Sequence, residues 1–156
     1  MRKAEATMQV AFPRDFVEFY SIHDGQPRDS GGLINGMTLS CLDRIIFNWK
    51  VLTELLEQGD FRTAKSRPDG PSKADWWNAK WIPFAENWSG DHICVDLDPP
   101  PGGKVGQVIR FWHADVERNY EAGSFREWFE GYVCDVEAGR FVYSARYGGL
   151  VDRRDA

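Results

Sequence analysis

Apolar residues recur at three- and four-residue spacing in three segments of the chain, and this spacing is typical of amphipathic helices. The first segment begins at Pro13, which suits the first turn of a helix, and we expect a helix over about 13–23. Gly25 follows and is the expected C′ residue, the left-handed position just beyond a helix. The second segment predicts a helix over about 41–58 that stops at Gly59.

Capping residues mark where two of these helices begin. Ser40 with Asp43 resembles a capping box, in which two side chains satisfy free backbone N–H groups of the first turn. Ser124 with Glu127 is a capping box of the usual S-x-x-E form. The helix that it opens has the strongest amphipathic pattern in the chain and closes at Gly139. Its apolar face comprises Phe125, Trp128, Phe129, Tyr132, Val133 and Val136.

Residues 92–98 alternate between apolar and polar side chains, which is the two-residue period of a strand. A second strand over about 105–113 is expected to pair with it as an antiparallel hairpin, because Pro and Gly fill the turn at 99–103. Shorter strands are expected at 37–39 and after Trp81. In the alternating strand, one face holds Ile93, Val95 and Leu97, and the other holds His92, Cys94, Asp96 and Asp98.

The order of these elements is helix, short strand, helix, several strands, helix. It predicts an α+β domain, with a mostly antiparallel sheet, helices packed on one side and one open face. The segments 26–36 and 60–75 are polar and rich in turn residues, so we expect loops there. We expect a single domain over 12–147, with 1–11 and 148–156 as flexible termini.

Composition narrows the classes of function. A formal charge of −5 disfavours nonspecific nucleic-acid binding, which depends on Lys and Arg neutralising phosphates. Cys41, Cys94 and Cys134 form no CxxC pair, so we expect reduced thiols in a cytoplasmic protein and no metal or cofactor. The first eight residues show no apolar signal region, and the longest apolar runs are too short to span a bilayer.

An ordered set of motifs runs along the chain. The first helix ends at Asp24-Gly25, and the second follows Ser40 and contains Trp49. After these come a W-x-P-F piece made by Trp81, Pro83 and Phe84, the turn Gly90-Asp91, the strand with Asp96 and Asp98, the run Gly106-Gln107-Val108-Ile109, and the closing helix that begins Ser124-Phe125. In this order the chain, over about 12–133, resembles the SUKH superfamily, which takes in Smi/Knr-type yeast regulators of cell-wall synthesis and many bacterial toxin-immunity proteins.

The resemblance implies protein binding without catalysis. Its bacterial members are cytoplasmic and bind a partner polypeptide, in many cases the toxic domain of a secreted nuclease or deaminase. Because the long extensions of the yeast regulators are not seen here, the leading hypothesis is an immunity protein that neutralises a toxin domain. The alternative is a regulatory or scaffold protein of the same fold. Two departures stand out: Asp24 replaces the usual Asn, and the segment before Pro13 is short.

A cluster of carboxylates supplies a third hypothesis from a different class. Asp91, Asp96 and Asp98, with His92 and His113 nearby in sequence, could hold a divalent cation and make the chain a small metal-dependent hydrolase. The simpler interpretation is a solvated strand face, with Asp91 accepting hydrogen bonds from turn amides. Cys94 with His113 could form a nucleophile and base, although a cysteine within a strand is usually a small buried hydrophobe.

The same region supplies the candidate partner-binding residues. Trp88 is flanked by polar residues, which favours an exposed position. Acidic residues nearby would speed association with a basic toxin. The candidate binding residues are Trp88, Asp91, Asp96, Asp98, Trp112 and Glu117, and the residues expected to maintain the fold are Gly25, Trp81, Pro83, Phe84, Gly90, Ser124 and Phe125.

Overall fold

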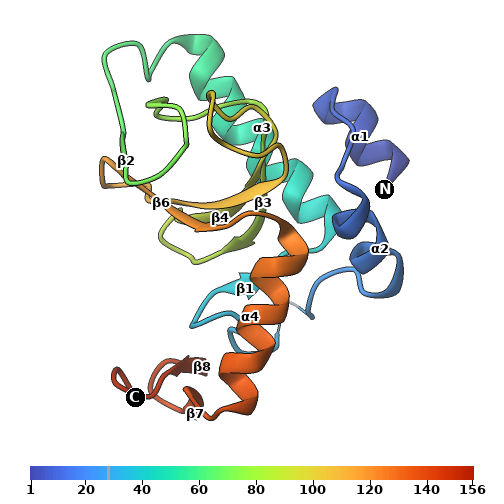
Figure 1. Ribbon diagram of the computed structural model, residues 1–156, viewed down its shortest axis with the longest axis vertical. Helices are drawn as coiled ribbons and strands as arrows, with labels where there is room; N and C mark the ends of the chain where they lie inside the picture. The colour runs from blue at the N-terminus through green and yellow to red at the C-terminus, as the bar shows by residue number, and fades with distance from the viewer. Residues whose placement is uncertain (28) are drawn as a thin grey trace.

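Six strands form one sheet in the order β1-β3-β4-β5-β6-β2, and the computed structural model describes residues 1–27 and 29–156 (Figure 1). All neighbouring pairs are antiparallel except β2 with β6. A separate two-stranded sheet joins β7 and β8. The elements are α1 (Arg2–Met8), α2 (Arg14–Ile22), β1 (Thr38–Leu39), α3 (Leu42–Gln58), β2 (Arg67–Pro68), β3 (Trp81–Glu86), β4 (His92–Asp96), β5 (Gln107–Phe111), β6 (Glu117–Ala122), α4 (Phe125–Glu137), β7 (Phe141–Ser144) and β8 (Gly149–Asp152).

One face of the sheet carries the main core, to which all four helices contribute. Phe16 of α2, Phe84 of β3 and Phe125 of α4 meet there edge to face, with ring centroids 5.0–6.2 Å apart. Trp128 adds a further contact at 4.9 Å from the Phe84 ring. Aromatic pairs in this geometry contribute beyond their buried area. The α+β fold with a mostly antiparallel sheet is therefore confirmed, and α1, α2 and α4 pack on this side of the sheet as expected.

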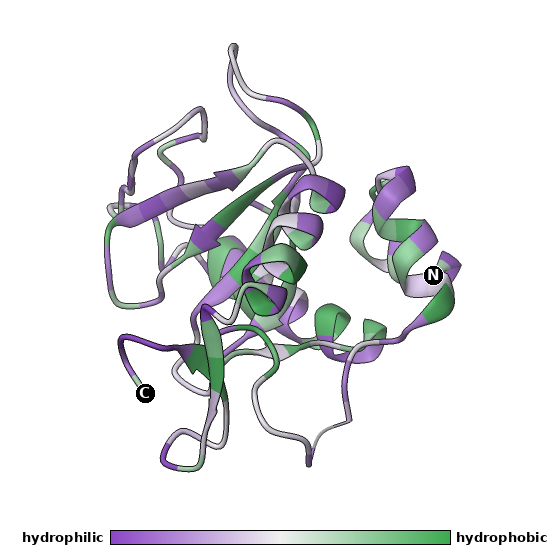
Figure 2. Cartoon of the chain, turned by 60° about the horizontal axis from the view of Figure 1, so that its bottom comes forward, coloured by the Kyte–Doolittle hydropathy of each residue, from purple (hydrophilic) through white to green (hydrophobic). Residues whose placement is uncertain are grey.

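The opposite face of the sheet is not open to solvent. Leu52, from the second half of α3, and Trp77, from the connection between α3 and β3, cover it. Beneath them lie Trp81, Cys94, Ile109 and Phe111. Both faces of β4 are therefore buried, although its side chains alternate between apolar and polar. A polar side chain such as that of Asp96 can be buried where it finds hydrogen-bond partners. Figure 2 shows the resulting concentration of apolar residues in the central strands and in the helices against them.

The segments expected to be flexible at both ends contain regular structure. In α1, Ala4 and Met8 are buried in the main core. At the other end, β8 pairs with β7 and forms a parallel bridge from Gly149 to Gly32. Figure 1 shows the β7–β8 hairpin at the lower end of α4, on the side of the molecule away from α1. The strands β2, β6, β7 and β8 lie in segments for which the sequence pattern predicted no strand.

Gly25 has a different role from the predicted one. The α2 helix ends at His23 in an extended conformation, so Gly25 is not its capping residue. Gly25 has a φ of 71°, and a Cβ there would lie 2.5 Å from the backbone nitrogen of Cys41. Only glycine permits this crossing of two backbone segments. The prediction failed because the constraint comes from a contact distant in sequence.

The two predicted capping boxes had different outcomes. Ser124 caps α4 as expected, since its Oγ accepts a hydrogen bond from the Glu127 N–H at 3.1 Å. Ser40 does not cap α3, which starts one residue later, and its buried Oγ has no partner among the described residues. Asp24 satisfies the start of α3 instead, because its Oδ1 accepts a hydrogen bond from the N–H of Leu42 at 2.7 Å. Asp24, which stands where the family usually has Asn, therefore supplies a capping side chain for α3.

Candidate functional site

The six candidate binding residues lie at two opposite ends of the sheet. Trp88 and Asp91 belong to the turn between β3 and β4. The register His92↔Phe111 brings the segment after β5, with Trp112, to the same end, and Glu117 begins β6 there. Asp96 and Asp98 lie at the far end of β4, beside Gln107. The six residues therefore do not form one continuous surface.

Asp91 maintains its turn. Its Oδ2 accepts a hydrogen bond from the Asn87 side chain at 2.7 Å, and its Oδ1 accepts one from the backbone N–H of His113 at 2.8 Å. Gly90 has a φ of 90°, a backbone conformation in which other residues are strained. Asp91 was expected to accept hydrogen bonds from turn amides, but the amides of Ser89 and Asp91 in this turn donate to Asn87 Oδ1, and Asp91 holds Asn87 in place.

Asp96 is not on a solvated strand face. It is completely buried, and its carboxylate accepts hydrogen bonds from the backbone N–H of Asp98 at 2.9 Å and from Gln107 at 3.0 Å. Burial raises the pKa of Asp96. A side chain in this position cannot form part of a partner-binding surface, so Asp96 is removed from the candidates.

Asp98 is occupied by an ion pair. Its Oδ2 lies 2.5 Å from Lys73 Nζ and accepts a second hydrogen bond from Asn78 at 3.1 Å. The hydrogen bond from Lys73 lowers the pKa of Asp98. Within residues 1–27 and 29–156, no group of three or more His, Cys, Asp or Glu side chains could hold a metal ion. The hydrolase hypothesis therefore gains no ligand set from the described residues.

Cys94 lies in the interior. Its side chain is fully buried in the cluster with Trp77 and Trp81, and burial raises the pKa of its thiol. A nucleophilic cysteine needs the opposite, a lowered pKa and an accessible sulfur. The interpretation of Cys94 as a small buried hydrophobe is confirmed.

Trp112 and Glu117 make local contacts at the sheet end. Trp112 donates a hydrogen bond from Nε1 to Asn119 at 2.6 Å, and the Arg110 guanidinium lies 5.3 Å from the Trp112 ring centroid. Glu117 is exposed and pairs loosely with Arg67 at 3.4 Å. Exposed pairs of this kind contribute little to stability. Both residues remain accessible, and their role in partner binding stays a prediction.

Trp88 belongs to an exposed apolar surface that the sequence pattern did not reveal. Its side chain is 81% exposed, and on the outer side of α3 Phe47 is 54% and Val51 42% exposed. These three residues, with Arg44, are called the Trp88 patch below. They line a groove of about 230 Å³ between α3 and the β3–β4 turn, with His92 and His113 on its other side. Concentrated apolar exposure of this kind is typical of interaction sites.

Arg44 is held rigidly in the middle of this patch. Its Nε and Nη2 donate hydrogen bonds to the two carboxylate oxygens of Glu86, at 2.6 and 3.0 Å. Glu86 is buried and also accepts a hydrogen bond from Asn48 at 2.8 Å. The fixed guanidinium lies 4.9 Å from the Phe47 ring centroid and 5.9 Å from that of Trp88. The Arg44 guanidinium is therefore held in place without a partner, which lowers the entropy cost of binding at this residue.

The sequence held a signal for Phe47 and Val51. Both lie within the predicted second helix, but outside its apolar stripe of Leu42, Ile45, Ile46, Trp49, Leu52 and Leu56. Apolar residues on the polar side of an amphipathic helix are candidates for a second contact surface. Their position beside Trp88 came only from the tertiary structure.

His92 forms part of the groove and is kept neutral. Its side chain is buried, its Nδ1 has no hydrogen-bond partner among the described residues, and burial lowers the pKa from 6.5 to about 4. Below pH 6.5 the unfolded chain binds a proton at this position that the folded chain binds only near pH 4. The free energy of unfolding is therefore not reduced by His92 above pH 6.5, and it falls as the pH drops from 6.5 towards 4.

We expect His92→Leu to flatten this part of the pH dependence. Since a pKa difference of one corresponds to about 1.4 kcal/mol, the wild-type chain should lose up to about 3 kcal/mol more unfolding free energy than the variant between neutral pH and about pH 4. Urea denaturation of both proteins across this pH range measures the difference. Parallel pH profiles for the two proteins would show that His92 does not titrate abnormally.

Comparison with known proteins assigns the chain to a protein family. The SMI1 / KNR4 family (SUKH-1) matches residues 1–131, which is more than half of the chain. The chain belongs to this family. The SUKH resemblance is thus confirmed.

Several fungal relatives share this SMI1 / KNR4 region. The chain is 28% identical over 152 residues to the "Cell wall biosynthesis/cell cycle regulator smi1" of Schizosaccharomyces pombe, covering 88% of this chain and 30% of that protein. It is 27% identical over 188 residues to the "Cell wall assembly regulator SMI1" of Saccharomyces cerevisiae, covering 97% and 36%. It is 25% identical over 177 residues to the "Glucan synthesis regulatory protein" of Neurospora crassa, covering 90% and 33%. The chain spans about a third of the length of these relatives.

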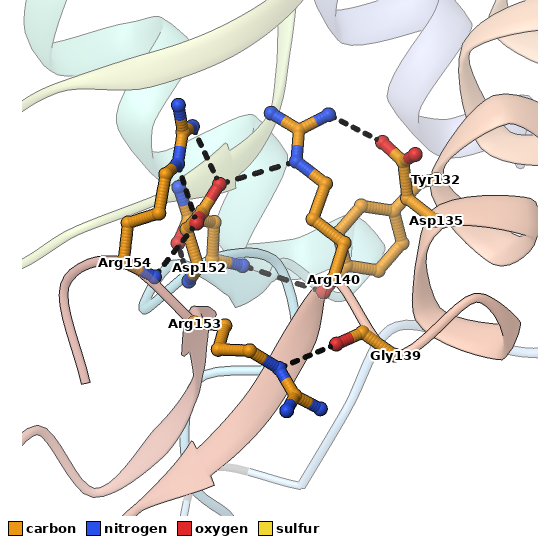
Figure 3. Close-up of polar contacts among 8 residues, drawn as sticks. Tyr132, Asp135, Gly139, Arg140, Asp152, Arg153 and Arg154 are labelled. Carbon is orange, nitrogen blue, oxygen red and sulfur yellow. Dashed lines mark hydrogen bonds and ion pairs between the residues drawn. The ribbon is translucent and has the colours of Figure 1, made fainter.

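The SMI1 / KNR4 match ends within α4, before the β7–β8 hairpin. Asp152 fastens this hairpin (Figure 3): its carboxylate accepts hydrogen bonds from Arg154 Nε and Nη2 at 2.9 and 2.8 Å and from Arg140 Nε at 3.1 Å. Arg154 and Arg140 together lower the pKa of Asp152 well below its ordinary value. On the other edge of β8, the N–H of Asp152 donates to Asn35 Oδ1 at 2.9 Å.

The helices of the described residues were compared with the requirements for a membrane-spanning helix. None of those in residues 1–27 and 29–156 combines the length and the apolar character needed to cross a bilayer.

Proposed function

We propose that the chain is a non-catalytic regulatory domain of the SMI1 / KNR4 family that binds a partner protein through the Trp88 patch. The observation that carries this proposal is the family membership, since relatives over this region are named regulators of cell-wall assembly, the cell cycle or glucan synthesis. Regulation is therefore placed ahead of toxin neutralisation as the function. The reported relatives are fungal regulators and give the immunity hypothesis no support.

The chemistry of the Trp88 patch supports a protein partner. Trp and Arg are enriched among the residues that dominate binding energy in protein interfaces. Here an exposed Trp88 and Phe47 lie on either side of Arg44, whose position is fixed by the buried Glu86. The adjoining groove of about 230 Å³ is large enough for one or two apolar side chains of a partner, but small for a drug-sized ligand.

We expect Trp88→Ala to weaken partner binding by at least about thirtyfold, which corresponds to the roughly 2 kcal/mol typical of a central interface residue. The fold should be unaffected, because the Trp88 side chain lies almost entirely in solvent. The measurement is affinity capture from the host with wild-type and variant chains as bait, followed by a dissociation constant for each purified partner. Ile22→Ala is a matched control, since Ile22 is a similarly exposed apolar residue at the end of α2.

Three results would contradict parts of the proposal. Partners that bind Trp88→Ala and the wild type equally, but lose affinity in Ile22→Ala, would place the interface elsewhere. Turnover of a small-molecule substrate by the purified chain would contradict a non-catalytic domain. A purified toxin domain as the partner that depends on Trp88 would restore the immunity hypothesis in place of regulation.

A further inference from the structure

The β7–β8 hairpin differs in charge from the rest of the chain. From residue 138 onward the sequence contains Arg140, Arg146, Arg153 and Arg154 against Asp152 and Asp155, which gives a formal charge of +2. The whole chain has a formal charge of −5. Arg140 and Arg154 are ion-paired with Asp152, and Arg140 also with Asp135, so Arg146 and Arg153 are the basic groups that carry the excess charge of this segment.

The outer edge of β7 is open. The N–H of Arg153 donates to the carbonyl of Arg140 at 2.8 Å, so these two residues form a hydrogen-bonded pair. Hydrogen-bonded pairs alternate along an antiparallel ladder, and the next ones are therefore Val142 with Val151 and Ser144 with Gly149. The backbone groups of Phe141 and Tyr143 therefore point away from β8. In the part of the chain that the structure describes, no hydrogen bond outside the ladder reaches these groups.

The edge of β1 shows how a strand edge of this protein can be covered. On β1, the N–H of Leu39 donates to Gln26 Oε1 at 2.8 Å, and its carbonyl accepts from the N–H of Gln26 at 3.0 Å. The β7 sequence, Phe141-Val142-Tyr143-Ser144, contains neither a charged residue nor a proline, the usual means of blocking an edge. The β7 edge therefore offers an unblocked template for one more strand.

Arginines stand at both ends of this open edge. Arg153 lies beside the start of β7, where its Nε donates to the carbonyl of Gly139 at 3.0 Å (Figure 3). Arg146 lies in the turn after β7, with its guanidinium 5.4 Å from the ring centroid of the exposed Tyr147. Four strand residues span about 13 Å at roughly 3.3 Å each, so the two arginines frame a short extended segment. Tyr143, 70% exposed, lies between them.

We propose that the open edge of β7 binds an extended acidic segment of a partner protein, which adds to the hairpin as a third strand. Main-chain hydrogen bonds to Phe141 and Tyr143 supply affinity, and carboxylates that meet Arg146 and Arg153 supply specificity. Nucleic acid is a poorer fit, because its binding requires many phosphate contacts and the protein as a whole is acidic.

The test uses the full chain and a fluorescein-labelled short peptide of alternating glutamate and valine, with binding measured by fluorescence anisotropy. Tyr143→Pro removes the outward-facing N–H together with the tyrosine side chain, and it leaves the inward ladder bonds of β7 in place. We expect it to weaken peptide binding by at least about tenfold, whereas Tyr143→Ala, which keeps the N–H, should weaken binding less. The double variant Arg146→Glu/Arg153→Glu should also lose at least about tenfold, and binding should weaken as salt rises.

Several controls make the outcome decisive. Arg2→Glu changes the charge of an exposed residue on α1, away from the hairpin, and should leave peptide binding unchanged. Hydrogen exchange of the Val142 and Val151 amides shows whether the hairpin remains folded in each variant. Equal binding of a peptide with lysine in place of glutamate, or unaltered binding by Tyr143→Pro, would overturn the proposal.

Two further outcomes also count against it. Tighter binding of a single-stranded oligonucleotide than of the acidic peptide would make nucleic acid the ligand. Self-association in light scattering that disappears in Tyr143→Pro would make a second copy of the chain the occupant of the edge. The proposal is independent of the Trp88 patch, because Trp88→Ala leaves β7 intact and Tyr143→Pro leaves the patch intact.

Discussion

Replacing Phe84 by alanine should lower the free energy of unfolding by about 3–5 kcal/mol, the range for truncation of a buried aromatic residue. Phe84 is fully buried in β3, at the centre of the main core. Its ring contacts those of Phe16 in α2 and Phe125 and Trp128 in α4, at 6.2, 5.1 and 4.9 Å between centroids. The cavity left by alanine would adjoin two helices and the sheet, so it cannot be filled by a local shift.

Urea denaturation with an unchanged slope measures this loss. Phe84→Leu keeps most of the volume and should lose about half as much. As a surface control, Phe47→Ala removes the same side chain from an exposed position on α3 and should change stability by less than about 1 kcal/mol. A loss below about 1.5 kcal/mol for Phe84→Ala would show that the contacts around this ring are not tightly packed.

Arg118→Ala should destabilise the chain by a similar amount, about 3–5 kcal/mol, for a different reason. Arg118 is completely buried in β6, and its guanidinium donates hydrogen bonds to the carbonyls of Trp112, Asp115 and Glu117 at 3.2, 2.9 and 2.5 Å. It donates a fourth to the carbonyl of Trp76 at 2.8 Å. Removing it leaves four partly buried carbonyls without this donor, each at a cost of about 1 kcal/mol.

The charge of Arg118 is retained in this interior. Burial lowers its pKa to about 10, so it remains protonated at neutral pH. The guanidinium carbon lies 4.4 Å from the ring centroid of Phe111 and 4.9 Å from that of Trp76. Trp76 belongs to the connection between α3 and β3, which covers this face of the sheet. Arg118→Ala is therefore expected to loosen this connection as well.

Arg118→Lys separates geometry from charge. Lysine keeps the positive charge but cannot reach all four carbonyls with a planar fork, so it should recover less than half of the lost stability. Chemical denaturation of the three proteins, together with Trp fluorescence as a probe of Trp76 and Trp77, measures both effects. Stability of Arg118→Ala within about 1 kcal/mol of the wild type would show that water replaces the guanidinium without cost.

Local patterns were sufficient for elements whose interactions lie near in sequence. The 92–98 and 105–113 hairpin, the helix at 41–58 and the Ser124 capping box all rest on spacing or on contacts within a few residues, and all three are present. The buried position of Phe125 also follows from its helix stripe, whereas those of Trp81 and Phe84 were implied by the family resemblance. Such features are encoded locally, because a helix stripe and a strand alternation record which side meets the core.

Prediction failed where a distant segment supplies the decisive contact. The β6 sequence is Glu-Arg-Asn-Tyr-Glu-Ala, which has no apolar face, and the burial of Arg118 depends on the carbonyl and ring of Trp76 from the connection before β3. Asp96 was predicted to be solvated, because its partner Gln107 and the cover by the connection before β3 are not visible in β4. Asp24 caps a helix that begins many residues later.

The sequence by itself determined the α+β class, the order of its main elements, the aromatic core and the family. The class, the element order and the core follow from hydrophobic period and capping, which are properties of neighbouring residues, and the family follows from the ordered set of motifs. The tertiary structure alone decided that both faces of the sheet are buried, that Trp88 lies beside Phe47 and Arg44, and that β7 presents an open edge between two arginines. These features depend on which side chains and backbone groups meet across the fold. Contacts between residues distant in sequence produce no periodic pattern along the chain, so they could not be predicted from it.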